Sequence, residues 1–173
     1  RRSDPQAHLG EIAAHFGFDG HGIGLITAVD VRKAITVTVD GAVVTSTVGV
    51  RQPTEDDLVD LTALEAAPAS PKEPGTINTV AWLPAVFNNA ALLNLLVTAT
   101  EAKVAALHQV GIDNPPMGSD ALCLLSYQPG MHDAAGSTEE YGGPRSTWGA
   151  RLSRALTETI VAAHERAHEP ARS

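Results

Sequence analysis

The chain has 173 residues, enough for one domain over residues 1–173, and carries a net charge of −8 from 12 Lys+Arg against 20 Asp+Glu. This acidic balance argues against nucleic acid and anionic membranes as partners, since both favour basic patches, and no apolar run approaches the roughly 18 residues of a membrane span. The single cysteine, Cys123, excludes an internal disulfide and favours a reducing compartment, so we expect a cytoplasmic protein.

The first part of the chain predicts a helix followed by strands. Ser3-Asp4-Pro5 is typical of a helix start, and apolar residues at helical spacing lead from it to a stop at Gly17. Residues 23–28 form a short apolar run that predicts a strand. Residues 34–50 are rich in Val and Thr on both sides of the turn signal Asp40-Gly41, and they predict a β-hairpin.

The rest of the chain mixes helices and strands without a regular βαβ repeat. Residues 52–74 contain several prolines and acids, and they predict a flexible surface loop. The other predicted elements are a strand at 77–83, a long helix from Asn88 or Asn89 to about Val110, a strand at 120–126, and a last helix from Ser146 or Thr147 to about His168. The expected class is α+β, a mixed sheet with a β-hairpin, packed by the long central helix and the C-terminal helix.

Two short motifs match known site patterns only in part. His164-Glu165-Arg166-Ala167-His168 fits the zinc-protease pattern, but such sites need a third ligand downstream and the sequence ends five residues later, so we interpret it as a solvated helix end. Gly20, Gly22 and Gly24 follow a helix and open a strand, whereas a dinucleotide fingerprint follows a strand and opens a helix. We therefore predict a turn there, and no metal site.

The long predicted helix carries a lysine on its apolar face. With Leu92 as the origin and about 100° per residue, most apolar side chains fall within about 80° and Lys103 falls near 20°. Desolvating an unpaired ammonium is costly, so Lys103 either extends its stem to solvent or belongs to a site. Glu101 lies roughly 160° away around the helix and cannot easily pair with it.

A carboxylate from another element is therefore expected beside Lys103. Asp120 is the candidate, because it follows Gly118-Ser119 and opens a predicted strand next to loops. An ordinary strand-cap aspartate is the alternative. Gly75-Thr76-Ile77-Asn78 also places small polar groups at a strand start, where turn chemistry is the simpler interpretation.

A set of short stretches keeps its order and spacing along nearly the whole chain. The stretches are Ser3-Asp4-Pro5 with His8-Leu9, Gly24–Arg32, Thr47–Gly49, Gly75–Asn78, Thr98–Lys103, Ala105–Leu107, Gly118–Ala121 and Gly143–Gly149. This ordered set resembles the adenosylcobinamide amidohydrolase family, with Thr98–Lys103 as the strongest part. The resemblance implies hydrolysis of the aminopropanol amide of adenosylcobinamide, giving adenosylcobyric acid in cobalamin salvage.

The same resemblance implies a cobalt corrinoid as substrate and neither a cofactor nor a metal of the protein's own; a homodimer is compatible with it. The residues expected to carry the reaction are Lys103, Asp120 and Glu101. Those expected to bind substrate are Thr27, Asp30, Thr76, Asn78, Thr100, Ser119 and Arg145.

Two mechanisms are open at this point, because amide hydrolysis needs an activated nucleophile and donors for the tetrahedral oxyanion. In the first, water attacks directly, with Asp120 or Glu101 as general base and Lys103 polarising the carbonyl or protonating the amine. In the second, Thr76 or Thr100 is the nucleophile and Lys103 is its base.

Two departures from the family pattern bear on activity. Family members usually carry extra residues before the Asp-Pro helix, including a Gly-rich strand, and these are not seen here. Residues 114–119 read Asn-Pro-Pro-Met-Gly-Ser, where members usually have a Thr- and Gly-rich run. The alternatives are therefore a family member that binds a corrinoid without cleaving it, and an unrelated small-molecule hydrolase on the same fold.

Overall fold

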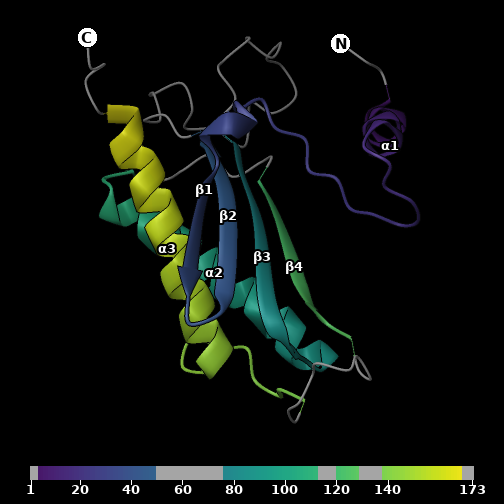
Figure 1. Ribbon diagram of the computed structural model, residues 1–173. Helices are drawn as coiled ribbons and strands as arrows, with labels where there is room; N and C mark the ends of the chain where they lie inside the picture. The colour runs from purple at the N-terminus through teal and green to yellow at the C-terminus, as the bar shows by residue number, and fades with distance from the viewer. Residues whose placement is uncertain (1–3, 50–75, 113–119, 129–137, 169–173) are drawn as a thin grey trace, which may run out of the picture.

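A computed structural model describes residues 4–49, 76–112, 120–128 and 138–168, and its centre is a four-stranded sheet (Figure 1). The strands are β1 (Ile35–Val39), β2 (Ala42–Gly49), β3 (Thr76–Val86) and β4 (Ala121–Tyr127), in the order β1-β2-β3-β4. The first three strands pair antiparallel, and β4 pairs parallel to β3. The predicted α+β class with a mixed sheet is therefore confirmed.

The predicted hairpin is formed by β1 and β2 around a two-residue turn. Asp40 and Gly41 both have positive φ, 44° and 90°, which the right-handed twist of the flanking strands favours at a tight turn. The register Val39↔Ala42 follows directly from this turn. Alternate residues of β2, among them Val44 and Ser46, then point to the same buried face.

Two long helices cover one face of the sheet. They are α2 (Asn89–Gln109), which makes the crossover that the parallel β3–β4 pair requires, and α3 (Thr147–His168). The Asn88 side chain accepts a hydrogen bond from Ala91 N and caps α2, as the sequence predicted. In Figure 1 both helices lie behind the sheet. The core between the layers includes Leu83, Leu95 and Leu156, each almost fully buried.

The helix α2 has the composition of a membrane span, which the sequence analysis did not anticipate. It has 21 residues and a mean hydropathy of 1.4 in its most apolar window. Core helices also reach these values, and length and composition alone do not separate the two cases. In this structure Leu95, Ala99 and Leu107 of α2 lie in the core beneath the sheet and α3.

The N-terminal part of the chain lies on the other side of the sheet. It contains α1 (Pro5–His15), capped by Asp4 as predicted, and a short 3₁₀ helix, η1 (Val31–Lys33). The strand predicted at residues 23–28 is wrong, because this segment crosses the open face of the sheet and joins no ladder. The carbonyl of Ile26 accepts from the Asn78 side chain at 3.0 Å, and the Ile26 side chain is 51% exposed.

The start of α3 packs unusually close to the chain that precedes it. Gly149 is buried, and a Cβ atom built there would overlap the carbonyl oxygen of Gly143. Gly142, in this preceding chain, packs against Ala91 and Leu95 of α2, and its carbonyl accepts from Thr98 of α2 at 2.9 Å. The missing side chains of Gly142 and Gly149 therefore let the chain before α3 lie in backbone contact with both helices.

We predict that Gly149→Ala lowers the free energy of unfolding by about 2–3 kcal/mol, because backbone must shift to admit the methyl group. Urea denaturation monitored by circular dichroism measures this change in the free energy of unfolding. The matched control is Gly10→Ala in α1, where a Cβ meets nothing within 4 Å, and its effect should stay within about 1 kcal/mol. Equal stability of the two variants would contradict the packing described between Gly149 and the chain before α3.

Candidate active site

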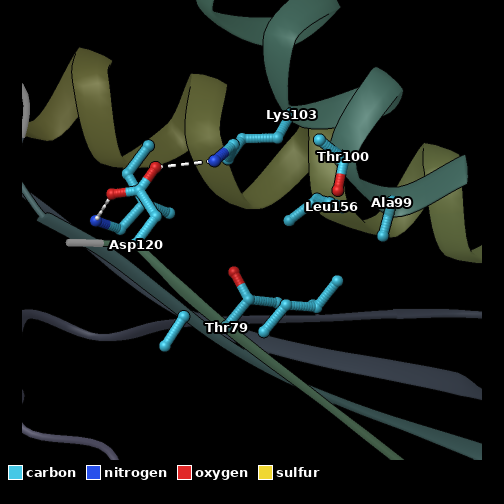
Figure 2. A pocket seen from close by; sticks show the side chains of 9 residues that line it. Thr79, Ala99, Thr100, Lys103, Asp120 and Leu156 are labelled. Atoms are coloured by element: carbon cyan, nitrogen blue, oxygen red, sulfur yellow. Dashed lines mark hydrogen bonds and ion pairs between the residues drawn. The ribbon is translucent and has the colours of Figure 1, made fainter. Parts of the chain in front are cut away.

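The predicted partners Lys103 and Asp120 form an ion pair between α2 and the sheet (Figure 2). Lys103 Nζ lies 2.6 Å from Asp120 Oδ2, and the backbone N–H of Ile77 donates to Asp120 Oδ1 at 2.8 Å. The two side chains are only 13% and 11% exposed. The ammonium on the apolar stripe of α2 is therefore paired, and its partner comes from another element.

The strand register explains why Asp120 stands there. Pairing between β3 and β4 begins at Asn78↔Ala121, so the N–H of Ile77 lies just beyond the ladder. The carboxylate of Asp120, the residue immediately before β4, takes the place of the missing strand carbonyl. A carboxylate accepts about four hydrogen bonds, so the two bonds described leave room for further donors.

A small cavity of about 110 Å³ opens beside this pair. Its lining residues are Ile77, Thr79, Ala99, Thr100, Lys103, Asp120, Ala121, Leu122 and Leu156. In Figure 2 the side chains of Thr79, Thr100 and Lys103 surround the same space, with Leu156 beyond. The cavity holds a few water molecules or one amide group, and it combines an ion pair, two hydroxyls and apolar walls.

One of these hydroxyls belongs to a buried chain that sequence analysis missed. Thr79 Oγ1 lies 3.0 Å from Ser46 Oγ, which in turn accepts from Thr159 Oγ1 of α3 at 3.1 Å. Thr159 Oγ1 also lies 2.8 Å from the carbonyl of Leu156, and its single proton can serve only one of these acceptors at a time. If Ser46 donates to Thr79, the Thr79 proton is free to point into the cavity.

Other predicted polar residues of β3 lie on the opposite face of the sheet. Thr76 and Asn78 alternate with Ile77 and Thr79, so they point away from the cavity. Asn78 faces Thr47 across the β2–β3 pair. Thr47 Oγ1 and Asn78 Oδ1 are both buried, and neither has a hydrogen-bond partner among the residues that the structure describes.

Three further predicted residues sit in local backbone structure outside the cavity. Thr27 Oγ1 accepts from Val29 N, and Asp30 caps η1 while pairing with Arg32 at 2.7 Å. The Arg32 guanidinium holds the pKa of the Asp30 carboxyl below its usual value. Arg145 is exposed just before α3. Ser119 lies outside the described residues.

Thr100 joins the cavity, whereas Glu101 does not. Thr100 Oγ1 donates its proton to the carbonyl of Leu96, so in the cavity its oxygen can only accept hydrogen bonds. Glu101 is exposed, and it lines a different hollow between the outer sides of α2 and α3. Sequence geometry had already placed Glu101 across the helix from Lys103.

The histidines of the zinc-protease-like motif pack on each other at the end of α3. The rings of His164 and His168 lie 4.2 Å apart, and His168 Nδ1 is 2.8 Å from the carbonyl of His164. Within the described part of the chain, no group of three or more His, Cys, Asp or Glu side chains could hold a metal ion.

Comparison with known proteins gives the family of the chain. The family model described as adenosylcobinamide amidohydrolase matches residues 1–171. The chain belongs to this family. Among the curated proteins none matches the chain, and no solved structure matches it. Membership in an amidohydrolase family supports an enzyme that cleaves amide bonds, and the Lys103–Asp120 cavity is where the structure gathers groups suited to that reaction.

We predict strong energetic coupling between Lys103 and Asp120. Lys103→Met and Asp120→Asn should each lower the free energy of unfolding by about 3 kcal/mol, because each leaves a mostly buried partner unpaired. The double variant should lose clearly less than the sum. Chemical denaturation of the four proteins gives this cycle, and additive losses would show that the two side chains do not depend on each other.

Proposed function

We propose that this protein hydrolyses the aminopropanol amide of adenosylcobinamide, giving adenosylcobyric acid and aminopropanol. The observation that carries the proposal is the Lys103–Asp120 pair lining a small, hydroxyl-bearing cavity of about 110 Å³. Family membership supplies the reaction class and the substrate named in the family's description. The substrate's cobalt corrinoid is too large for this cavity, so only the amide-bearing arm enters it.

Asp120 is the general base in this scheme. Its two carboxylate oxygens each keep accepting capacity after bonding Ile77 N and Lys103 Nζ. A water molecule in the cavity donates to this carboxylate, loses its proton to it as it attacks the amide carbon, and forms a tetrahedral intermediate. The proton then passes to the leaving aminopropanol nitrogen, so that amide and water become acid and amine.

Lys103 stabilises the negative charge that develops during this attack. Its ammonium is fixed beside the carboxylate by a 2.6 Å contact and is largely shielded from solvent, where a charge acts more strongly than in water. It also offers a proton on the leaving-group side. Both effects act on the transition state more than on the neutral amide.

The hydroxyl of Thr79 is suited to hold the oxyanion. It lies in the cavity lining, 3.0 Å from Ser46 Oγ, and in the arrangement where Ser46 donates to it the Thr79 proton is available to the substrate. Thr100 lies in the same lining, but its one proton is donated to the carbonyl of Leu96, so it can only accept from a bound group. Thr76 and Asn78, which were expected to bind substrate, point to the other face of the sheet and do not reach this cavity.

Direct attack by water is favoured over a threonine nucleophile. Thr100 is the one of the two predicted nucleophiles that reaches the cavity, but Lys103, its proposed base, donates a hydrogen bond to Asp120 as an ammonium. A lysine held in this way activates no hydroxyl, because a general base must be free to accept a proton.

The decisive experiment incubates the purified protein with adenosylcobinamide and detects adenosylcobyric acid and aminopropanol by mass spectrometry. We expect turnover in the parent protein and a loss of about 10²–10⁴-fold in kcat for Lys103→Met and for Asp120→Asn. Lys33→Met and Asp40→Asn are matched controls on exposed residues and should keep parental rates. A folded parent that binds corrinoid without product would instead favour a binding protein, and full activity of both site variants would refute the scheme.

A separate prediction concerns Thr79. Thr79→Val removes the hydroxyl at nearly constant volume and should lower kcat by about 10²-fold, with little change in KM, because the lost bond forms in the transition state. Thr79→Ser keeps the hydroxyl and should retain most of the activity. Equal rates in the Val and Ser variants would show that Thr79 does not donate to the reacting oxygen.

A further inference from the structure

A second, larger cavity lies on the face of the sheet that the helices leave open. Its volume is about 470 Å³, and its lining residues are His21, Gly22, Ile23, Leu25, Val80, Cys123 and Leu125. The first four come from the segment between α1 and η1, and the others from β3 and β4. In Figure 1 the N-terminal segment runs beside β4 on this side of the molecule. The walls are almost entirely apolar apart from one imidazole and one thiol.

The two cavities differ in the ligand that they can take. The cavity at Lys103 and Asp120 admits an amide arm and no macrocycle. The open-face cavity has over four times that volume, and the exposed side chains of Ile23, Ile26 and Leu125 extend its apolar surface. An exposed apolar surface next to a hollow is typical of a binding site, and this one has room for a ligand larger than an amide arm.

The edge strand β4 brings the two cavities within reach of each other. Ala121 and Leu122 line the cavity at Lys103, whereas Cys123 and Leu125 line the open-face cavity. Cys123 stands three residues from Asp120, which is about 10 Å along a strand. A ligand seated on the open face can therefore pass a flexible side arm around this edge to Asp120.

We propose that the open-face cavity binds the corrin ring of the substrate, with the imidazole of His21 as an axial ligand to its cobalt. This inference rests on the proposed function, because it takes the corrinoid as the substrate. Cobinamide has no nucleotide base of its own, so its lower axial position carries an exchangeable water. Neutral imidazole is the commonest metal ligand in proteins. His21 supplies the imidazole among the residues that line this cavity.

The open face of the sheet, beside the larger cavity, also carries acceptors for the ring's amide groups. Asn78 is the neighbour of Val80 on the open face and lies toward Asp120. Its Oδ1 and the Oγ1 of Thr47 are the buried oxygens left without a partner among the described residues. A buried acceptor without a donor costs free energy, which an amide N–H of the ligand recovers when it binds.

The hollow between the outer sides of α2 and α3 is a poorer site, although its volume is about 610 Å³. Its lining includes Glu101 and Glu158 and offers no imidazole or thiol. It also lies across α2 from Lys103, so an arm from a ligand there meets the helix itself.

Electron paramagnetic resonance of bound cob(II)inamide tests the axial ligand directly. The unpaired electron of low-spin Co(II) points along the axial direction, so an imidazole ¹⁴N splits the cobalt lines into triplets and a ¹⁵N label turns these into doublets. We expect triplets with the parent protein, doublets with protein labelled with ¹⁵N-histidine, and no nitrogen splitting with His21→Ala. His168→Ala, at the far end of α3, should keep the triplets. We also expect His21→Ala to bind cob(II)inamide about tenfold more weakly.

Each other outcome overturns the inference in a recognisable way. Triplets that persist in His21→Ala assign the ligand to another nitrogen, and a bound corrinoid without nitrogen splitting leaves water or the Cys123 sulfur at the cobalt. No binding of cob(II)inamide removes the site. If adenosylcobinamide is still hydrolysed in any of these cases, the proposed hydrolysis stands without the His21 site. If the triplets disappear in His21→Ala but the parent protein forms no product, the site stands and the hydrolysis is refuted.

Discussion

One carboxylate ties the beginning of the sheet to the long helix. Asp120 holds the Ile77 N–H with one oxygen and the Lys103 ammonium with the other. Each of these groups alone would be costly to bury, since one is an amide beyond the strand ladder and the other a charge on an apolar stripe. The carboxylate pairs with both of these groups, and the cavity lies next to it, between α2 and the sheet.

The period of two along β3 divides the polar residues between two environments. Thr79 faces the helices and enters the buried hydroxyl chain, while Asn78 faces the N-terminal segment and holds the carbonyl of Ile26. A shift of one residue therefore decides whether a side chain meets the ion pair or the open face. The helix-covered side offers an ion pair and hydroxyls, and the open side offers apolar surface, so the proposed chemistry and the proposed ring recognition fall on different faces of one strand pair.

Much of the fold was predictable from sequence because local signals agree with the tertiary structure. The Asp40-Gly41 turn and the Asn88 cap fix β1–β2 and the start of α2 by short-range chemistry. The position of Lys103 on the apolar stripe of its helix also predicted a carboxylate partner, because an unpaired buried ammonium is costly. The hydroxyl chain could not be predicted, because Ser46 meets residues 33 and 113 positions away in the chain. The strand expected at 23–28 failed because apolar composition cannot show whether a ladder partner exists.

The cost of the Lys103–Asp120 pair argues that it serves more than stability. A buried ion pair recovers its desolvation energy only with good geometry and further hydrogen bonds, and apolar residues of similar size often stabilise a core equally well or better. Here the pair has one further described bond, from Ile77 N, and it borders a cavity in place of packed side chains. Filling that space with apolar side chains would stabilise the fold and remove the site. The cavity thus combines an unfilled space with a paired ammonium and a carboxylate that can still accept hydrogen bonds. This combination favours a site that binds a reacting group over a purely structural ion pair.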